Sequence, residues 1–440
     1  MVNFSFIKGV SHTFLAQGIS ALFQIFIGII TARYLGAEGR GLYSLFFSVA
    51  AIGANFAYLG MSQATVYFRN RENIANNILY GNVIVVFLFQ SLFLAIVLFY
   101  LPDDVLVKLI GSDSPVMAQV IWFILVILLA DILLTGMVLS NHNFLLYSLY
   151  ILFQSLFILL ATLPLIFIPI TGEYAIIIRV SVVGILLFLY WLVVLKKLEL
   201  GGFIINFNLL KRQLKFGFKS FLQNLIGLLN YRILLLLLGL MSSISDVAMF
   251  SVALLLVEVI RFVPNTIGTV LLPKLTTLKG RELIKFSTRT LRIVITVNLV
   301  ITPIIFYYAE WIILFLFGDE YSASVSVARI LLIGGFFGLV YQVLTRVFTS
   351  ESKQKISIIS ASLGLFISIV LTFLLVPGQG VDGAAFGFLF GSLFTAIIML
   401  VSFCRAYQVS LIYVLIPTKD DFRFVYKKMY YAINYWRLKV

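Results

Sequence analysis

Ionisable side chains inside apolar stretches are the features of this sequence best suited to chemistry. Seven of them fall within hydrophobic runs long enough to cross a membrane, namely His12, Asp131, Arg179, Arg232, Glu258, Arg261 and Arg329. An arginine at the centre of a membrane helix costs about 2.5–3.5 kcal/mol on insertion scales. Several such charges together therefore predict a water-filled cavity lined by protein, in which each charge meets a partner or a ligand.

The sign of these charges indicates the cargo. Four arginines stand against two carboxylates, and a guanidinium is a planar, two-pronged donor that suits a phosphate or diphosphate. Arg232 is the strongest candidate, because it lies deep in an apolar run, with Arg261, Arg179 or Arg329 assisting. An alternative for Arg179 and Arg329 is that they extend to the membrane surface from nearby helix ends.

The two carboxylates, Asp131 and Glu258, are the charged groups in these runs that a proton could neutralise. Asp131 has no opposite charge three or four residues away, and burial favours the neutral form of a carboxylic acid. It is either reversibly protonated or paired with another helix. Glu258 is three residues from Arg261, so an intrahelical ion pair is the alternative there. No cofactor is expected.

The composition excludes an ordinary soluble enzyme. Hydrophobic residues make up 62% and charged residues 11% of the 440 positions, against about 45–50% and about 25% in soluble domains. A mean hydropathy of +1.09 predicts an all-α polytopic membrane protein. Cys404 is the single cysteine and there are two histidines, too few to suggest a metal site or a Ser-His-Asp triad. The net charge of +14 does not indicate a nucleic-acid partner in so apolar a chain.

A crossing helix needs about 20 mostly apolar residues, and the sequence contains twelve such runs. Turn residues and charges separate them. The runs lie near 10–32, 41–61, 80–100, 118–140, 144–168, 174–195, 216–238, 247–270, 291–309, 324–347, 356–376 and 383–405.

Lysine and arginine concentrate in alternate connections, whereas the remaining connections hold only Arg33, Arg40 and Lys108. The positive-inside rule therefore predicts that both termini are cytoplasmic. The basic connection 198–215 would separate a six-helix lobe, 1–197, from a second, 216–407. Residues 408–440 form a basic amphipathic tail, with Thr418 as a helix cap, suited to anionic membrane lipid or to a partner protein.

Three motifs resemble those of one family. Residues 31–44, TARYLGAEGRGLYS, resemble the first-loop signature of Wzx-type polysaccharide flippases of the multidrug/oligosaccharidyl-lipid/polysaccharide (MOP) exporter superfamily. Residues 373–377, FLLVP, followed by 380–385, GVDGAA, are similar to that family's last turn and helix start. Residues 318–321, GDEY, resemble the loop before its tenth span.

The resemblance implies a MATE-like fold of two lobes in the bacterial inner membrane. It implies alternating access, by which an undecaprenyl-diphosphate-linked oligosaccharide, an O-antigen or related unit, crosses between leaflets. It also implies coupling to a proton or sodium gradient, for which Asp131 and Glu258 are the candidate residues. Membrane lipids, a polysaccharide polymerase and glycosyltransferases are the expected partners. Arg33 lies in the loop signature and is a further candidate substrate ligand, with turn geometry as its alternative.

Two other functions remain as alternatives. A cation or drug antiporter of the same superfamily is disfavoured by the arginine excess. A membrane glycan polymerase or ligase needs catalytic groups on a substantial outer loop, whereas the longest predicted one is about 101–117. None of the predicted outer loops contains histidine.

Overall fold

The computed structural model describes residues 4–197, 202–275, 278, 280–351, 353–418, 421 and 423, with their side chains except at 4–11 and 262–274. Regular secondary structure in these residues is entirely helical, which confirms the predicted all-α class. Helices satisfy their own backbone hydrogen bonds, as a lipid environment requires. In chain order the elements are α1 (Phe4–Ala57), α2 (Met61–Glu72), α3 (Asn76–Tyr100), α4 (Asp103–Ile110), α5 (Pro115–Ser140), α6 (Phe144–Thr162), η1 (Leu163–Ile166), α7 (Gly172–Lys197), α8 (Phe207–Met241), α9 (Ile244–Leu275), α10 (Gly280–Phe317), η2 (Asp319–Tyr321), α11 (Ser324–Ser350), α12 (Gln354–Gln379), α13 (Val381–Tyr407) and α14 (Leu411–Leu415).

Helix α1 joins two predicted spans, 10–32 and 41–61, in one run that is broken at Gly36. Gly36 has φ 69° and ψ 178°, which glycine adopts without the steric cost that a side chain would add. The expected loop between these spans is therefore helical apart from one residue. The second span ends earlier than predicted, because positive φ angles at Leu59 and Gly60 turn the chain into α2.

Ten helices among the described residues are long and apolar enough to cross a membrane. The first, His12–Ala57, includes both of the spans that meet at Gly36. Helix α9, which contains the predicted span 247–270, is not among the ten. The chain is a multi-pass membrane protein, while the count of twelve and the cytoplasmic location of both termini stay predictions.

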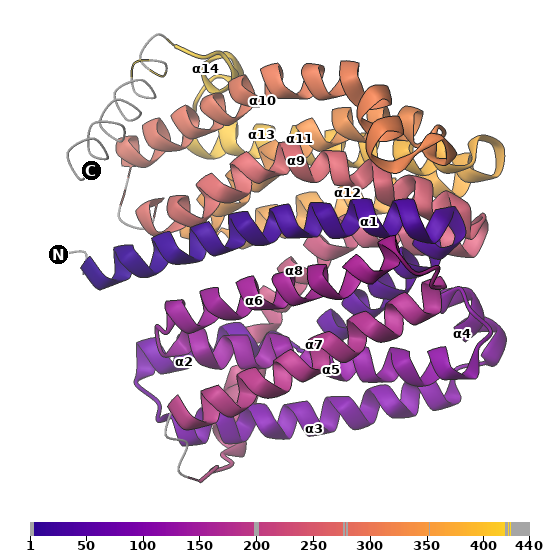
Figure 1. Ribbon diagram of the computed structural model, residues 1–440. Helices are drawn as coiled ribbons and strands as arrows, with labels where there is room; N and C mark the ends of the chain where they lie inside the picture. The colour runs from indigo at the N-terminus through magenta and orange to yellow at the C-terminus, as the bar shows by residue number, and fades with distance from the viewer. Residues whose placement is uncertain are drawn as a thin grey trace, which may run out of the picture.

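The helices form two groups on either side of α1, with α2–α7 in one and α9–α13 in the other (Figure 1). Each group has its own buried apolar cluster. Helix α8 belongs to both, because Leu225 packs in the first cluster and Leu234 in the second. The predicted boundaries at 197 and 216 stay predictions, and the structure shows that α8 physically connects the two groups.

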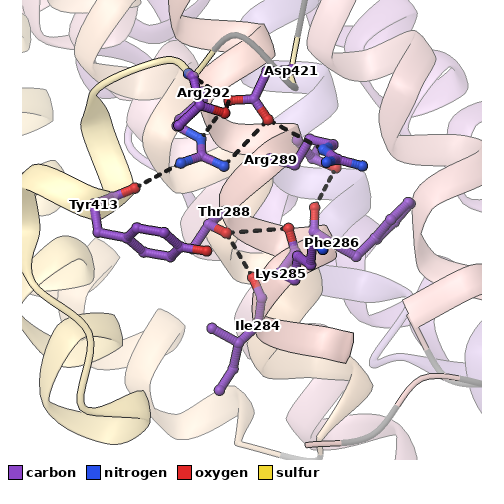
Figure 2. Close-up of polar contacts among 10 residues, drawn as sticks. Ile284, Lys285, Phe286, Thr288, Arg289, Arg292, Tyr413 and Asp421 are labelled. Atoms are coloured by element: carbon purple, nitrogen blue, oxygen red, sulfur yellow. Dashed lines mark hydrogen bonds and ion pairs between the residues drawn. The ribbon is translucent and has the colours of Figure 1, made fainter. Parts of the chain in front are cut away.

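The end of the described chain is held against α10 (Figure 2). The Asp421 carboxylate is 2% exposed and lies 3.0 Å from Arg292 and 3.2 Å from Arg289. It also accepts hydrogen bonds from the backbone N–H and hydroxyl of Thr418, both at 2.8 Å. This is one half of a capping box, because the Asp421 carboxylate accepts from the Thr418 N–H, while the Asp421 N–H donates to the backbone carbonyl of Thr418 and not to its hydroxyl. Most of the predicted basic tail, from residue 424 on, lies outside the described residues.

Candidate functional site

A cavity of about 580 Å³ lies between α1, α7, α8 and α9, where helices of the two groups meet. Helix α1 lines it from both sides of the Gly36 break. A second cavity, of about 300 Å³ between α3, α5 and α7, has walls that carry no charged side chain. The first is therefore the candidate site, and it includes the following charged and hydroxyl residues: Arg40, Tyr43, Ser44, Arg179, Tyr231, Arg232, Ser251 and Glu258.

Arg232 lines this cavity, as its position in an apolar run predicted. Its Nη1 donates a hydrogen bond to Oγ of Ser48 on α1, at 3.2 Å. Among the described side chains, no carboxylate lies within ion-pairing distance of Arg232. Arg232 therefore joins α8 to α1, and no described carboxylate pairs with its charge.

Arg179 on α7 also lines the cavity instead of extending to the helix end. Its Nη1 donates to the Tyr43 hydroxyl at 2.5 Å. The guanidinium lies 4.3 Å from the centre of the Phe47 ring, which is a cation–π contact. These two contacts with α1 fix the direction in which Arg179 points.

Arg261 and Glu258 form the intrahelical ion pair that their spacing allows, with 2.5 Å between Nη1 and Oε1. The Arg261 guanidinium stacks on Tyr231, 3.8 Å from the ring centre. Glu258 is half-exposed and lines the cavity. The pair brings Arg261 to the cavity's edge, but it removes part of the positive charge that this arginine would otherwise present.

Arg40 is the cavity residue that the sequence analysis placed in an outer loop. Its side chain is 7% exposed. Nη1 donates to Oγ1 of Thr31 at 2.6 Å, and Nε donates to Oγ of Ser251 at 3.3 Å. The sequence signal for this position is that residues 33–40 contain no proline, so a helix can continue through them. In the structure only Gly36 departs from helical geometry, and the helix that follows places Arg40 in the cavity wall. Three lining guanidiniums, with Arg261 next to the lining residues Tyr231 and Glu258, stand against one carboxylate and leave this site positive.

Two predicted substrate ligands lie elsewhere. Arg329 pairs with the exposed Glu310 at 3.4 Å. Arg33 is exposed and donates from Nη1 to the carbonyl oxygen of Phe315 at 3.4 Å. Neither lines the cavity, so the expected grouping of Arg329 and Arg33 with Arg232 is not found.

Asp131 belongs to a separate polar cluster within the first group of helices. It accepts a hydrogen bond from the Tyr150 hydroxyl at 2.6 Å. Tyr150 stacks on Tyr190 with 3.9 Å between ring centres, and Gln154 donates to its hydroxyl at 3.1 Å. The buried Tyr190 hydroxyl has no hydrogen-bond partner among the described residues. The partner of Asp131 on another helix is thus the uncharged hydroxyl of Tyr150 on α6, and no oppositely charged side chain pairs with it among the described residues.

The described residues contain no group of three or more His, Cys, Asp or Glu side chains arranged to hold a metal ion. The polar atoms of the candidate cavity are dominated by guanidinium and hydroxyl groups. Such a set can bind and orient an anion, and it offers no nucleophile paired with a base.

Residues 6–279, more than half of the chain, match the family described as "Polysaccharide biosynthesis protein". The chain belongs to this polysaccharide biosynthesis protein family. The match includes α1, with its kink and Arg40, and the other three helices that line the cavity. No match was found among curated proteins.

Solved structures share the fold at low sequence identity. A "Lipid II flippase MurJ, inward closed conformation" is 15% identical with a TM-score of 0.72, covering 88% of this chain and 86% of that one. An "inward-facing conformation of a multidrug resistance MATE family transporter of the MOP superfamily" is 16% identical with a TM-score of 0.68, covering 88% and 94%. A structure of the MATE multidrug transporter DinF-BH is 16% identical with a TM-score of 0.67, covering 92% and 96%. The protein therefore has the MATE-like fold predicted from its motifs, and a transporter function agrees with its family.

Proposed function

We propose that the protein is a flippase that moves an undecaprenyl-diphosphate-linked oligosaccharide, an O-antigen or related surface-polysaccharide unit, across the bacterial inner membrane. The observation that carries this proposal is the cavity in which Arg40, Arg179 and Arg232 converge, with Arg261 at its edge. An anion that enters it gains several charge-assisted hydrogen bonds in a partly desolvated setting. The family's role in polysaccharide biosynthesis supports a glycan as the attached group.

In this mechanism the diphosphate is held and no bond is made or broken. Arg232 lies on α8 and Arg179 on α7, so one anion can contact both the first group of helices and α8, the helix that connects the two groups. The glycan occupies the rest of the cavity, and the polyprenyl chain stays in the bilayer between the lobes. Rocking of the two groups about this site exposes the head group first to the cytoplasmic and then to the periplasmic side. Glycosyltransferases would supply this substrate, and a polymerase would consume the product.

We assign ion coupling to Asp131, because its cluster is separate from the arginines and its one charged group can be neutralised by a proton. Glu258 is the second candidate and is already paired with Arg261. Asp131→Asn should leave downhill flipping in place and abolish its acceleration by an imposed proton or sodium gradient. A wild-type rate that ignores both gradients would contradict the coupling assignment.

The binding site itself is tested by the affinity of the purified protein for farnesyl diphosphate, a short polyprenyl diphosphate. Arg232→Ala should weaken binding by at least about tenfold, the expected loss for hydrogen bonds to a charged group. Lys219→Ala removes an exposed cation from the same helix and is the matched control. Equal affinities of Arg232→Ala and wild type would refute the assignment of Arg232.

A cation or drug antiporter is the second candidate, because solved multidrug transporters share this fold. Its strongest local support is the half-exposed Glu258 carboxylate. The excess of guanidinium groups in the same cavity repels cations and favours the flippase. Ethidium efflux from cells that depends on Glu258 or Asp131 would support the antiporter instead.

A further inference from the structure

Two segments that resemble family motifs meet in space, although they lie far apart in the chain. The first includes Gly36 and Ala37 in α1, and the second is η2 with Glu320 and Tyr321. Oε1 of Glu320 accepts a hydrogen bond from the backbone N–H of Ala37 at 2.9 Å, across 283 residues. The mechanism above does not use this contact.

The Ala37 N–H needs an acceptor because Gly36 divides α1 into two helical segments. The first N–H groups of a helix have no partner within that helix, and a carboxylate there is also stabilised by the helix dipole. A Cβ placed on Gly36 would lie 3.7 Å from both oxygens of Glu320. Glu320 therefore acts as a helix cap that is supplied by a distant part of the chain.

Tyr321 satisfies the other side of the break. Its hydroxyl donates to the carbonyl oxygen of Ala32 at 2.8 Å, and that carbonyl lies four residues before Gly36, where the regular helical acceptor pattern ends. The Tyr321 side chain is fully buried. Adjacent residues of η2 thus complete both backbone ends of the kink in α1.

The kink matters for the proposed site because Arg40 follows Ala37 by about one helical turn. Arg40 bonds to Thr31, before the break, and to Ser251 on α9. Next to Arg40, a Cβ on Gly41 would lie 1.9 Å from the carbonyl oxygen of Ile244, so α1 and α9 touch backbone to backbone there. Helices α1 and α9 are therefore in direct contact beside Arg40, which lines the cavity.

We propose that Glu320 and Tyr321 are positioning residues that hold the α1 kink, aim Arg40 into the cavity and latch this end of the cavity shut. The inference rests on the proposed function only in assigning a role to Arg40. Opening of this end requires the Glu320–Ala37 and Tyr321–Ala32 hydrogen bonds to break, so their loss favours the state that is open on the η2 side.

A cysteine reporter tests the latch without any substrate. Leu254 lines the cavity, so we place the reporter there as Leu254→Cys and remove the native cysteine with Cys404→Ser. A membrane-impermeant maleimide added on the η2 side then labels the reporter at a rate that depends on how open this end is. Glu320→Ala should raise the labelling rate at least about fivefold, as expected from losing a charge-assisted hydrogen bond. Asp319→Ala, an exposed neighbouring acid, is the control and should leave the rate unchanged.

Ala37→Pro removes the donor and keeps Glu320, and proline is accepted at the first position of a helix. It should raise the labelling rate as much as Glu320→Ala does. The double variant, Ala37→Pro with Glu320→Ala, should be labelled no faster than either single variant, because both remove the same hydrogen bond. Glu320→Gln keeps an oxygen acceptor and should restore part of the closure. Labelling at the control rate in both single variants, or additive effects in the double, would overturn the latch. Because no substrate is present, failure of Arg232→Ala to weaken farnesyl diphosphate binding would instead count against the proposed function.

Discussion

Arg40 is held in its cavity position before any ligand arrives. Thr31 and Ser251 each accept one of its hydrogen bonds, and they lie on two different helices. A guanidinium offers five donors, so these two contacts orient the group and leave others for an anion. Preorganised donors of this kind do not pay the cost of being ordered when the ligand binds.

Arg40→Ala is expected to weaken farnesyl diphosphate binding by about tenfold, the effect of one lost hydrogen bond to a charged group. Arg40→Lys should recover only part of this affinity, because an ammonium cannot bond to Thr31, Ser251 and a phosphate in the same geometry. Isothermal titration of the purified variants measures both effects. Lys108→Ala on α4 is the control for a change in net charge, and an affinity of Arg40→Ala equal to that control would remove Arg40 from the site.

The sequence could predict some cavity residues and not others, for physical reasons. Arg232 was predicted because an arginine in an apolar run needs a polar environment wherever the helix packs. Arg329 also lies within a predicted span, although nearer to its end, and its pairing with Glu310 depends on how α10 and α11 pack. The Tyr150 partner of Asp131 likewise comes from the next helix, which local spacing does not reveal.

At the scale of elements, hydropathy located the helices well and their continuity poorly. The run through 33–40 was expected to be a loop because it carries charges and glycines, yet it is helical apart from Gly36. The hydrogen bonds from Glu320 and Tyr321 that complete this break come from almost 300 residues further on. Helix α8 shows a similar limit, because a boundary drawn from charge alone does not reveal that one helix packs in both apolar clusters.

The ion pairs of Asp421 with Arg292 and Arg289 on α10 should stabilise the folded protein. The variant Asp421→Asn leaves the buried Arg292 guanidinium, 4% exposed, without the carboxylate that pairs with it. Loss of one partner of a buried pair costs about 3–5 kcal/mol, so thermal unfolding of the purified protein should occur at a lower temperature. Asp104→Asn, an exposed acid on α4, should shift it little; an equal effect of the two variants would show that the Asp421 pair is not stabilising.

The same contact predicts a pH dependence. Burial alone would raise the pKa of Asp421, but hydrogen bonds from Thr418 and Arg289 and the charge of Arg292 outweigh it and hold this pKa below its ordinary value. The pKa of an aspartic acid in the unfolded chain is about 3.9. Because the pKa of Asp421 is lower in the folded state, its carboxylate stabilises the fold at pH values above about 3.9, and this contribution is lost as the pH falls through the folded-state pKa. The difference in unfolding temperature between wild type and Asp421→Asn should therefore be constant near neutral pH and shrink below about pH 4. A difference that persists unchanged at lower pH would contradict the lowered pKa.

At the scale of the whole molecule, two apolar helix groups enclose one strongly positive cavity. The outer helix faces remain apolar, as Phe99, Tyr307 and Leu374 show with exposures of 82%, 76% and 69%. Surfaces of this kind are stable in lipid and not in water. Much of the net charge of +14 comes from basic residues near helix ends, such as Lys196, Lys197 and Lys211, so the charge that bears on the cargo is the small fraction inside the cavity.

The most direct test of the central claim is the translocation of a fluorescent undecaprenyl-diphosphate-linked oligosaccharide in proteoliposomes. The fraction that becomes accessible to a membrane-impermeant quencher or glycosidase on the opposite side reports the initial rate. We expect the wild-type protein to accelerate this movement above protein-free vesicles, and Arg232→Ala to slow it by at least about tenfold through loss of hydrogen bonds to the diphosphate. Movement of the lipid-linked glycan at the wild-type rate by Arg232→Ala, or no acceleration by the wild type, would contradict the account.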